Sequence, residues 1–117
     1  MSEEKTIFKK IIDKEIPSKI AYEDDLCMAF YDVSPQAPVH ILVIPKTTEL
    51  TSLDDVGEED KPLIGHIFCV IQKLAHEVGI AKDGYRVVSN CGSNACQTVP
   101  HLHFHLLGGR QFSWPPG

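Results

Sequence analysis

His101-Leu102-His103-Phe104-His105-Leu106-Leu107 alternates strictly between histidine and large apolar residues as far as Leu106. Successive side chains of a β-strand point to opposite faces of the sheet, so this alternation predicts a strand over residues 101–107. It places the three histidines on one solvent-facing surface and Leu102, Phe104 and Leu106 toward the core. Packing gives no reason to use histidine three times in five residues. We therefore interpret the three histidines as functional residues and not as structural ones.

Two chemistries use histidines in this way. One is metal binding, but His101 and His105 are ~13 Å apart on an extended strand. Zinc–nitrogen bonds are about 2 Å long, so all three rings cannot ligate one ion. An adjacent pair could do so, with Cys91 or Cys96 completing the shell. The other is phosphoryl or nucleotidyl transfer, because neutral imidazole is a nucleophile near pH 7 and imidazolium donates protons to phosphate oxygens.

The loop before the predicted strand favours the second chemistry. It reads Asn90-Cys91-Gly92-Ser93-Asn94-Ala95-Cys96-Gln97-Thr98, with small residues, amides and hydroxyls but no lysine or arginine. By composition it could be an ordinary surface connection. Such a loop can also turn several backbone N–H groups toward an anion, with Gln97 and Thr98 adding side-chain contacts. Beside a row of histidines we interpret it as an anion-binding loop.

The remaining sequence predicts an α+β fold with an antiparallel sheet. Thr6 is expected to cap a helix that begins at Ile7 and is stopped by Pro17. A second helix is expected from residues 60–62 to Gly79. Strands are expected over residues 19–23, 26–31, 39–45 and 85–89, besides 101–107. The order is helix, three strands, helix and two strands, which is typical of a segregated fold rather than of alternating βαβ units.

The second predicted helix has a wide apolar stripe. Ile64, Ile67, Phe68, Ile71, Leu74, Ala75 and Val78 share one face, and Leu63 and Val70 extend that face further. Two interpretations stay open on this pattern. The helix is either deeply buried in the core or sandwiched between its own sheet and a second subunit.

Composition limits the function classes. The chain has 117 residues, 43% of them hydrophobic and 23% charged, which predicts one globular domain over 1–117 with a short acidic extension at 1–5 and a tail at 108–117. The net charge of −5 argues against a nucleic acid polymer as partner. No signal peptide or apolar run of membrane-spanning length is visible, so we expect no membrane partner and a cytoplasmic location, with the nucleus as a second compartment. In that compartment the four cysteines are expected to be reduced thiols.

Gln97-Thr98-Val99-Pro100 leading into residues 101–107 resembles the signature of the histidine triad (HIT) family, H-φ-H-φ-H-φ-φ. Three further segments resemble its Hint branch. They are Asp32-Val33-Ser34-Pro35-Gln36-Ala37-Pro38-Val39-His40-Ile41-Leu42-Val43-Ile44-Pro45-Lys46, Ile7-Phe8 with Lys14-Glu15-Ile16-Pro17, and the ending Gly108-Gly109-Arg110-Gln111-Phe112-Ser113-Trp114-Pro115-Pro116-Gly117. The likeness covers the chain from Thr6 to Gly117.

The resemblance implies a HIT-like α+β fold, a five-stranded antiparallel sheet with two helices, in a homodimer that forms a larger continuous sheet. It also implies hydrolysis of adenosine 5′-monophosphoramidates, including AMP-NH2 and AMP joined to a lysine amine. In the family the middle histidine attacks the α-phosphorus and becomes a nucleotidyl-histidine that water then cleaves. No metal or other cofactor takes part, and the expected partner is a purine nucleotide, AMP or GMP, or a small phosphoramidate.

Carried onto this sequence, the resemblance makes His103 the nucleophile. His105 would contact the phosphate, and His40 and His101 would support the ring arrangement. Asp32 would accept hydrogen bonds from both ribose hydroxyls. Asn90, Gln97 and Thr98 would hold phosphate and leaving-group atoms, and Trp114 would reach the partner subunit's site. The purine would lie in an apolar slot formed by Ile7, Phe8, Ile16, Phe30 and Leu42.

Without the resemblance these residues have plainer interpretations. The apolar ones would be core in any fold, Asp32 could cap a turn, and Trp114 could lie in a loose end. The sequence also departs from the family at two positions. Thr98 stands where serine is usual, and its methyl group would crowd the leaving group. Cys96 stands where glycine is usual, which matters if the position needs a positive φ, and with Cys91 nearby it suggests redox sensitivity.

Two other functions remain open. One is hydrolysis of dinucleoside polyphosphates, as in the sister Fhit branch, although the Trp-Pro-Pro-Gly ending speaks against it. The other is a regulatory or scaffold protein with little catalysis, because proteins of this branch have been named protein kinase C inhibitors or interacting proteins. A zinc-binding role has also been attached to the same histidines.

Overall fold

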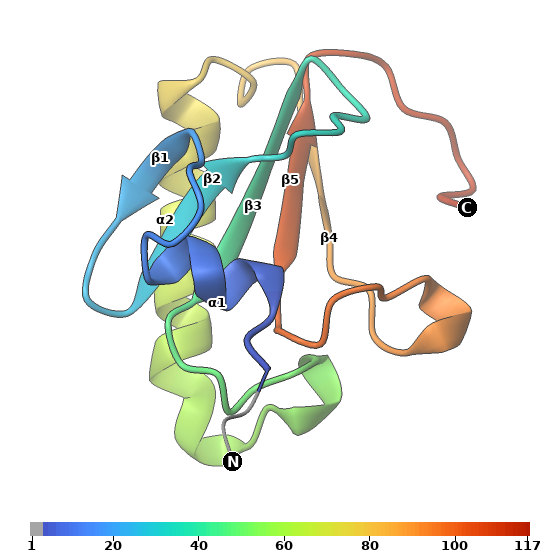
Figure 1. The fold of residues 1–117 in the computed structure, drawn as a ribbon. Helices are drawn as coiled ribbons and strands as arrows, with labels where there is room; N and C mark the ends of the chain where they lie inside the picture. Colours follow the sequence, from blue (N-terminus) through green and yellow to red (C-terminus); the bar gives the residue numbers. More distant parts are fainter. Residues whose placement is uncertain (1–3) are drawn as a thin grey trace.

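The structure, a computed structural model, describes residues 4–117, so residues 1–3 of the expected acidic extension lie outside the described part. Five strands form one antiparallel sheet in the order β1-β2-β3-β5-β4 (Figure 1). The strands are β1 (Ile20–Glu23), β2 (Cys27–Tyr31), β3 (Val39–Pro45), β4 (Tyr85–Val88) and β5 (Phe104–Gly108). The α+β class and the antiparallel sheet predicted from the sequence are confirmed.

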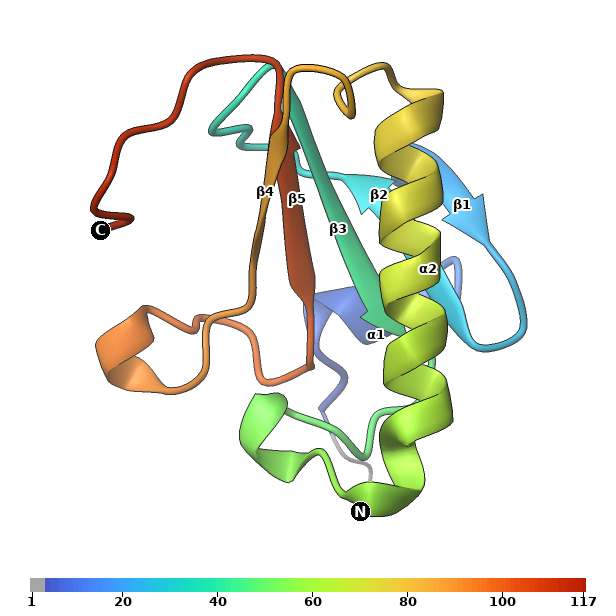
Figure 2. The ribbon, with the colours of Figure 1, turned by 180° about the vertical axis from the view of Figure 1, so that it is seen from behind.

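Two helices cover opposite faces of this sheet (Figures 1 and 2). The short helix α1 (Ile7–Ile12) begins at Thr6, whose Oγ1 accepts a hydrogen bond from the Lys9 N–H at 3.1 Å, as the predicted cap requires. The long helix α2 (Lys61–Glu77) ends just before Gly79, which has φ +81°. That left-handed conformation suits glycine and stops the helix.

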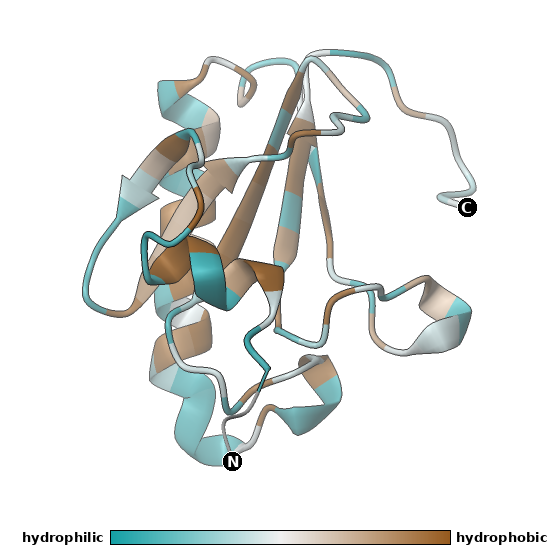
Figure 3. Ribbon diagram, viewed as in Figure 1, coloured by the Kyte–Doolittle hydropathy of each residue, from teal (hydrophilic) through white to brown (hydrophobic). Residues whose placement is uncertain are grey.

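The α2 face of the sheet carries the larger core. β3 is apolar along most of its length, whereas β5 alternates (Figure 3). Leu102, Phe104 and Leu106 all point to the α2 side, where they pack with Ile67, Ile71 and Leu74 of the helix. The outward part of the helix stripe is not covered within the described chain, because Phe68 remains 46% exposed. The helix is therefore buried on one side only.

The α1 face carries a smaller cluster of Phe8, Ile11, Met28, Phe30, Leu42 and Ile44. A helix of six residues cannot cover a five-stranded sheet. The sheet area beyond α1 is left for the histidines and for the loop over residues 90–98.

The strand predicted over residues 101–107 is shorter in the structure, because β5 begins only at Phe104. The backbone N–H of His101 donates to Val99 and that of Leu102 to Leu50. These groups are therefore used by neighbouring loops instead of the sheet. The alternation of side chains nevertheless continues through the irregular part, so the predicted two faces are correct while the strand boundary was wrong.

Smaller corrections concern the other elements. β4 ends at Val88, one residue before the predicted end, and the Ser89 hydroxyl donates to the His103 carbonyl at 3.0 Å. Three short 3-10 helices, η1 (Leu53–Asp55), η2 (Glu58–Asp60) and η3 (Ser93–Ala95), were not predicted. Within residues 4–117, no helix combines the length and the apolarity needed to cross a membrane.

Candidate active site

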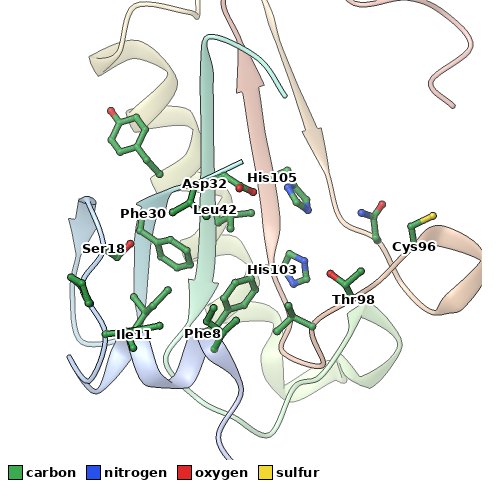
Figure 4. A pocket seen from close by; sticks show the side chains of 17 residues that line it. Phe8, Ile11, Ser18, Phe30, Asp32, Leu42, Cys96, Thr98, His103 and His105 are labelled. Atoms are coloured by element: carbon green, nitrogen blue, oxygen red, sulfur yellow. The ribbon is translucent and has the colours of Figure 1, made fainter. Parts of the chain in front are cut away.

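A cavity of about 310 Å³ opens on the α1 face of the sheet (Figure 4). Its size lies at the lower end of the range for small-molecule sites. The lining comes from α1, the segment after it, the end of β2, the middle of β3, the 90–99 loop and the histidine row. It brings together these predicted site residues: Ile7, Phe8, Ile16, Phe30, Asp32, Leu42, Asn90, Thr98, His103 and His105.

The end of the cavity beneath α1 is apolar. The rings of Phe8 and Phe30 meet edge to face at 5.5 Å between centroids, and Leu42 lies beside them. Ile7 and Ile16 complete this wall, with Ile7 still 53% exposed. A flat, largely apolar ring system would fit such a slot.

His103 has one ring nitrogen fixed and one available. Its Nδ1 lies 2.6 Å from the carbonyl oxygen of His101, and a carbonyl can only accept, so Nδ1 carries the proton. The other nitrogen, Nε2, therefore holds the lone pair. The ring is only 5% exposed and packs edge to face against Phe8, with centroids 5.0 Å apart. It was expected on a solvent-facing surface, which is wrong because α1 covers it.

His105 has the opposite tautomer, which is set by two successive hydrogen bonds, from Gln36 to His40 and from His40 to His105. The Gln36 backbone N–H donates to Nδ1 of His40 at 3.1 Å, so the proton of His40 is on Nε2. That Nε2 lies 2.8 Å from Nδ1 of His105 and donates to it. The proton of His105 is consequently on its own Nε2. Two histidines of the row thus present different atoms: a lone pair on His103 and an N–H on His105.

Burial keeps the supporting histidines neutral. Burial lowers the pKa of His105 to about 4, and the nearby His103 and His40 lower it further, against a small opposing effect of Asp32. Burial also lowers the pKa of His40, although Asp32 opposes the shift. Neutral rings are what the tautomers above require at pH 7.

His101 lies behind the cavity and does not line it. Its ring is 1% exposed, and its Nε2 lies 2.8 Å from the carbonyl oxygen of Pro45, to which it donates. Burial lowers its pKa, with the hydrogen bond to Pro45 opposing the shift. Through its own carbonyl it holds His103, which is a supporting position.

Asp32 combines the two roles that the sequence left open. Its Oδ1 accepts the Ser34 backbone N–H at 2.8 Å, which caps the turn after β2. Its Oδ2 lies 3.5 Å from Nε2 of His40, and the carboxylate also lines the cavity. Each carboxylate oxygen has two acceptor sites, so capacity remains for a ligand.

The 90–98 loop divides its residues between the cavity and its own structure. Asn90, Cys96 and Thr98 line the cavity. Gln97 does not, because its Oε1 accepts from the Gly92 N–H while its Nε2 donates to the carbonyls of Thr51 and Val99. The structure therefore uses the Gln97 side chain to hold the loop in shape, and not in direct contact with the cavity.

Cys96 occupies a left-handed conformation with φ 66° and ψ 32°. The sequence raised this position as one that favours glycine, and the positive φ is now observed. A non-glycine residue there stores strain of about 1 kcal/mol or more. Cys96 is also exposed, as are Cys69 and Cys91, while Cys27 is buried; no disulfide joins any of the four.

Trp114 lies far along the tail and is 80% exposed. Within the described chain it does not line the cavity.

Within residues 4–117, two groups of three side chains place metal-ligating atoms within 4.8 Å of one another: Asp32, His40 and His105, and Asp24, Cys27 and His66. Neither group contains Cys91 or Cys96, so the shell considered from the sequence does not form. In the first group the two histidine nitrogens are 2.8 Å apart and share a proton. Tetrahedral zinc with bonds of 2.0–2.1 Å needs nitrogens about 3.3 Å apart, so this arrangement does not fit zinc.

Several lining residues were missed at the sequence level. They are Ile11, Pro17, Ser18, Tyr31, Val33 and Val99. Ile11 is on the buried face of α1, and Tyr31 and Val33 flank Asp32 in sequence. No pattern in the sequence pointed to Ser18, whose position depends on the path of the chain after α1.

The sequence can be compared with known proteins. The HIT domain family matches residues 13–112. An uncharacterized HIT-like protein of Synechocystis is 55% identical over 114 residues, covering 97% of this chain and 98% of the relative. A 14 kDa zinc-binding protein of Zea mays is 52% identical over 113 residues, covering 96% and 88%.

Solved structures agree. A HIT family hydrolase from Legionella pneumophila superposes with a TM-score of 0.93 and 44% identity, covering 97% of this chain and all of the other. A histidine triad nucleotide-binding protein from Candida albicans superposes with a TM-score of 0.78 and 33% identity, covering 95% and 83%.

Proposed function

The chain belongs to the HIT domain family, and from that premise we propose that it is a purine nucleoside phosphoramidase. The substrates are adenosine 5′-monophosphoramidates such as AMP-NH2 and AMP joined to a lysine amine. The reaction passes through a covalent nucleotidyl-histidine on His103. A hydrolase name for one structural neighbour and a nucleotide-binding name for another support this class of reaction.

One observation carries the proposal: the opposite tautomers of His103 and His105. A nucleophile needs a lone pair directed at phosphorus, and Nε2 of His103 has one because Nδ1 donates to the His101 carbonyl. Charge developing on the phosphate oxygens needs a donor, and Nε2–H of His105 is one because Nδ1 accepts from His40. A row of histidines kept only for packing has no need of this division.

The reaction is a double displacement. In the first step the Nε2 lone pair of His103 forms a bond to phosphorus, the P–N bond of the substrate breaks, and its electron pair leaves with the amine nitrogen, which takes a proton from solvent. In the second step a water oxygen attacks phosphorus and releases a proton to solvent. The His103–phosphorus bond breaks and returns the lone pair to Nε2. The products are AMP and the free amine.

The nucleotide lies across the cavity in this proposal. The purine occupies the apolar slot of Phe8, Phe30 and their neighbours, and the ribose hydroxyls donate to Asp32. Asn90 and Thr98 contact the phosphate or the leaving group. Gln97 supports the same loop without reaching the ligand, because both ends of its amide are already bonded.

Rapid-quench intact-mass spectrometry with AMP-NH2 tests the covalent step. We expect a transient species heavier by one adenylyl group, and peptide mapping should place that group on His103. The His103→Ala variant should neither turn over nor carry the adduct. His76→Ala, at an exposed histidine of α2, serves as the matched control and should behave like the unmodified protein. Turnover with the adduct on another side chain, or without any adduct at the earliest quench times, would overturn the proposal.

We also propose the homodimer, a cytoplasmic location, and a contact of Trp114 with the partner's site. Two apolar side chains support the dimer: Phe68 on α2 is 46% exposed and Trp114 is 80% exposed. Sedimentation of the protein and of a Phe68→Glu variant tests it. A concentration-independent monomer for the unmodified protein would contradict it.

Zinc binding is the second candidate, because one relative is named a zinc-binding protein. The spacing of His40 and His105 speaks against zinc at this site, as shown above. Elemental analysis after dialysis decides the matter, since stoichiometric zinc that survives would revive a metal role. Comparing turnover of AMP-NH2 with that of diadenosine polyphosphate separates the phosphoramidase from the polyphosphate hydrolase. A protein with neither activity but with a regulatory partner would be the scaffold alternative.

A further inference from the structure

The apolar slot under α1 contains one polar side chain that the proposed mechanism does not use, Ser18. It lies in the segment between α1 and β1, lines the same cavity as Phe30 and His103, and is half-buried. Figure 4 shows it beyond Phe30 as seen from His103 and His105. Ser18 is therefore at the end of the cavity opposite the proposed reaction centre.

Strand pairing places the Ser18 side chain on the α1 face of the sheet. Ile20, the first residue of β1, pairs with Phe30, which belongs to the cluster under α1. The Tyr31 N–H donates to the Lys19 carbonyl at 3.0 Å, so the extended pairing continues one residue before β1 begins. Side chains two residues apart on an extended chain point to the same face, so Ser18 shares the face of Ile20 and Phe30.

The distance between the histidines and this end of the cavity fits the length of a nucleotide. His105 of β5 pairs with Leu42 of β3, and Leu42 pairs with Phe30 of β2. Phe30 in turn pairs with Ile20, so one row of residues crosses four strands. Three strand spacings of about 4.8 Å span about 14 Å. A purine nucleoside monophosphate with its phosphorus against the histidines has the far edge of its base near the end of this row, beside Ser18.

The Ser18 hydroxyl is the side-chain group that a base can reach at this end. Within residues 4–117, the cavity wall formed by α1, the segment before β1, the end of β2 and the middle of β3 has three polar side chains, Ser18, Tyr31 and Asp32. Tyr31 packs against the core on the α2 side, and Asp32 accepts from the Ser34 N–H and takes the ribose in the proposed function. The Ser18 hydroxyl forms no hydrogen bond within that part of the chain. Because no side-chain polar atom there is both buried and unpartnered, this hydroxyl is open to a ligand.

A purine that enters the slot loses water from its polar edge. The amino group at position 6 of adenine is a donor, and the oxygen at position 6 of guanine is an acceptor. Leaving either group without a partner in apolar surroundings costs free energy. A serine hydroxyl accepts from the first group and donates to the second, so it offsets that cost for both bases. A purine without a substituent at position 6 offers neither contact.

We propose that Ser18 determines base specificity: its hydroxyl forms a hydrogen bond with the substituent at position 6 of the purine. Nucleotides of 6-amino and 6-oxo purines are then preferred over nucleotides of a purine that lacks this group. The inference rests on the proposed function, because it requires the base to lie under α1 and the phosphorus to lie at the histidines. Ser18 contacts the base only and takes no part in the transfer of the nucleotidyl group.

Paired nucleotides with and without the substituent test this assignment. The 5′-phosphoramidates of adenosine and of purine riboside differ only in the 6-amino group, as do AMP and purine riboside 5′-monophosphate. We expect kcat/KM to favour the adenosine compound, and Kd to favour AMP, by about 2- to 10-fold, the size of one neutral hydrogen bond. The preference should lie in KM and not in kcat, because the contact is far from phosphorus and is the same before and during the reaction. Isothermal titration calorimetry gives the two Kd values.

Substitutions at Ser18 locate the effect. Ser18→Ala should bring both ratios to about one by weakening only the adenosine compounds, while Ser18→Thr keeps the hydroxyl and should keep part of the preference. Ser52→Ala is the matched control, because Ser52 makes no capping hydrogen bond and does not line this cavity, and it should leave both ratios unchanged. Each ratio compares two ligands on one protein, so a partly folded variant still reports it. If no variant folds, the ratios of the unmodified protein decide the point.

The outcomes separate this inference from the phosphoramidase. Nucleotide binding with the expected ratios but without hydrolysis of any phosphoramidate would refute the phosphoramidase and support the role of Ser18. Hydrolysis with ratios of one in the unmodified protein, or a preference for adenosine that survives in Ser18→Ala, would overturn only the role of Ser18. Binding of neither AMP nor purine riboside 5′-monophosphate would overturn both.

Discussion

The two faces of the sheet are covered by helices of very different length, 17 residues in α2 and 6 in α1. Under α2, side chains such as Ile67, Ile71 and Leu74 form a closed core. Under α1 the cover is incomplete, and a cavity of about 310 Å³ remains between Phe8 and the histidines. A long helix stabilises the sheet, and a short one leaves polar side chains both buried enough to be tuned and open enough to meet a ligand.

Each face also holds a histidine beside an aspartate, but the two pairs differ in their distances and hydrogen-bond partners. On the α2 side, Nε2 of His66 lies 2.6 Å from Oδ2 of Asp24, and that carboxylate also accepts from Tyr22 and two backbone N–H groups. On the α1 side, Nε2 of His40 is 3.5 Å from Asp32 but only 2.8 Å from His105. The first pair fastens the β1–β2 turn to α2. In the second, the N–H of His40 is donated to His105 instead of to the aspartate, and this sets the tautomer of His105.

The largest expected effect is on the α1 face. Replacing His103 by Asn should lower kcat for AMP-NH2 by about a thousandfold or more, because the nucleophile is lost. The free energy of unfolding should change far less, since the substitution leaves the α2 core intact. Stopped assays and urea unfolding on the same preparation check both halves. Loss of folding in step with loss of activity would contradict the separation of the two faces.

The next largest effect is expected on the α2 face, where a substitution should lower stability and leave turnover unchanged. Ile71 is 2% exposed, so Ile71→Ala should lower the free energy of unfolding by about 2–5 kcal/mol. Turnover per folded molecule should stay within about twofold, because no lining residue of the cavity is changed. Urea unfolding and active-site-normalised kcat measure the two quantities.

A matched pair of phenylalanines sharpens the comparison. Phe8 packs against Phe30 at 5.5 Å and His103 at 5.0 Å, whereas Phe68 packs against Phe104 at 5.3 Å on the other face. Aromatic pairs contribute about 0.5–1.5 kcal/mol, so Phe8→Leu should raise KM by about 2- to 12-fold. Phe68→Leu should leave KM unaltered. Equal changes in KM for the two variants would mean that the slot under α1 does not hold the base.

The last expected effect is a difference in pH dependence between the two faces. The pKa of His105 is lowered to about 4, while an unfolded histidine titrates near 6.5. Between these values the unfolded chain binds a proton that the folded chain does not. Stability should therefore fall as pH falls from about 6.5 toward 4. His105→Gln should flatten part of that slope, with the lowered pKa values of His40 and His101 accounting for the rest.

Asp24 is expected to act in the same direction but at lower pH. Burial alone would raise its pKa, but hydrogen bonds from Tyr22, Cys27, Leu26 and His66 outweigh burial and hold the pKa well below the ordinary 3.8. Its stabilisation is present above the unfolded value and is lost as pH falls below about 3.8. Urea midpoints at pH 7, 5 and 3.5 should show His105→Gln acting in the upper interval and Asp24→Asn in the lower one.

Most of the fold could be predicted from local patterns. The cap at Thr6, the two helices, the five strands and the two faces of residues 101–107 all follow from short-range spacing. The beginning of β5 was placed three residues too early, because the partners of the His101 and Leu102 backbone groups are loop carbonyls distant in sequence. Side-chain alternation does not report which backbone group bonds to which.

The residues of the candidate site were likewise identified only in part from the sequence. Its histidines, Asp32 and the apolar residues were identified from the sequence and its resemblance, and the structure gathers most of them around one cavity. Gln97 was assigned to the ligand, but its amide accepts from the Gly92 N–H and donates to the carbonyls of Thr51 and Val99. Ser18 had no sequence signal, since its position depends on chain segments that meet only after folding.

The sequence by itself determined which residue types are available and how they alternate, because covalent spacing decides which side chains share a face of a strand or helix. Tertiary structure alone decided which nitrogen of each ring carries the proton, because that depends on carbonyl and N–H partners as far apart as Gln36, His40 and His105. It also decided that one sheet face would be sealed and the other left open, since the length of the covering helix acts only once the helix is docked on the strands.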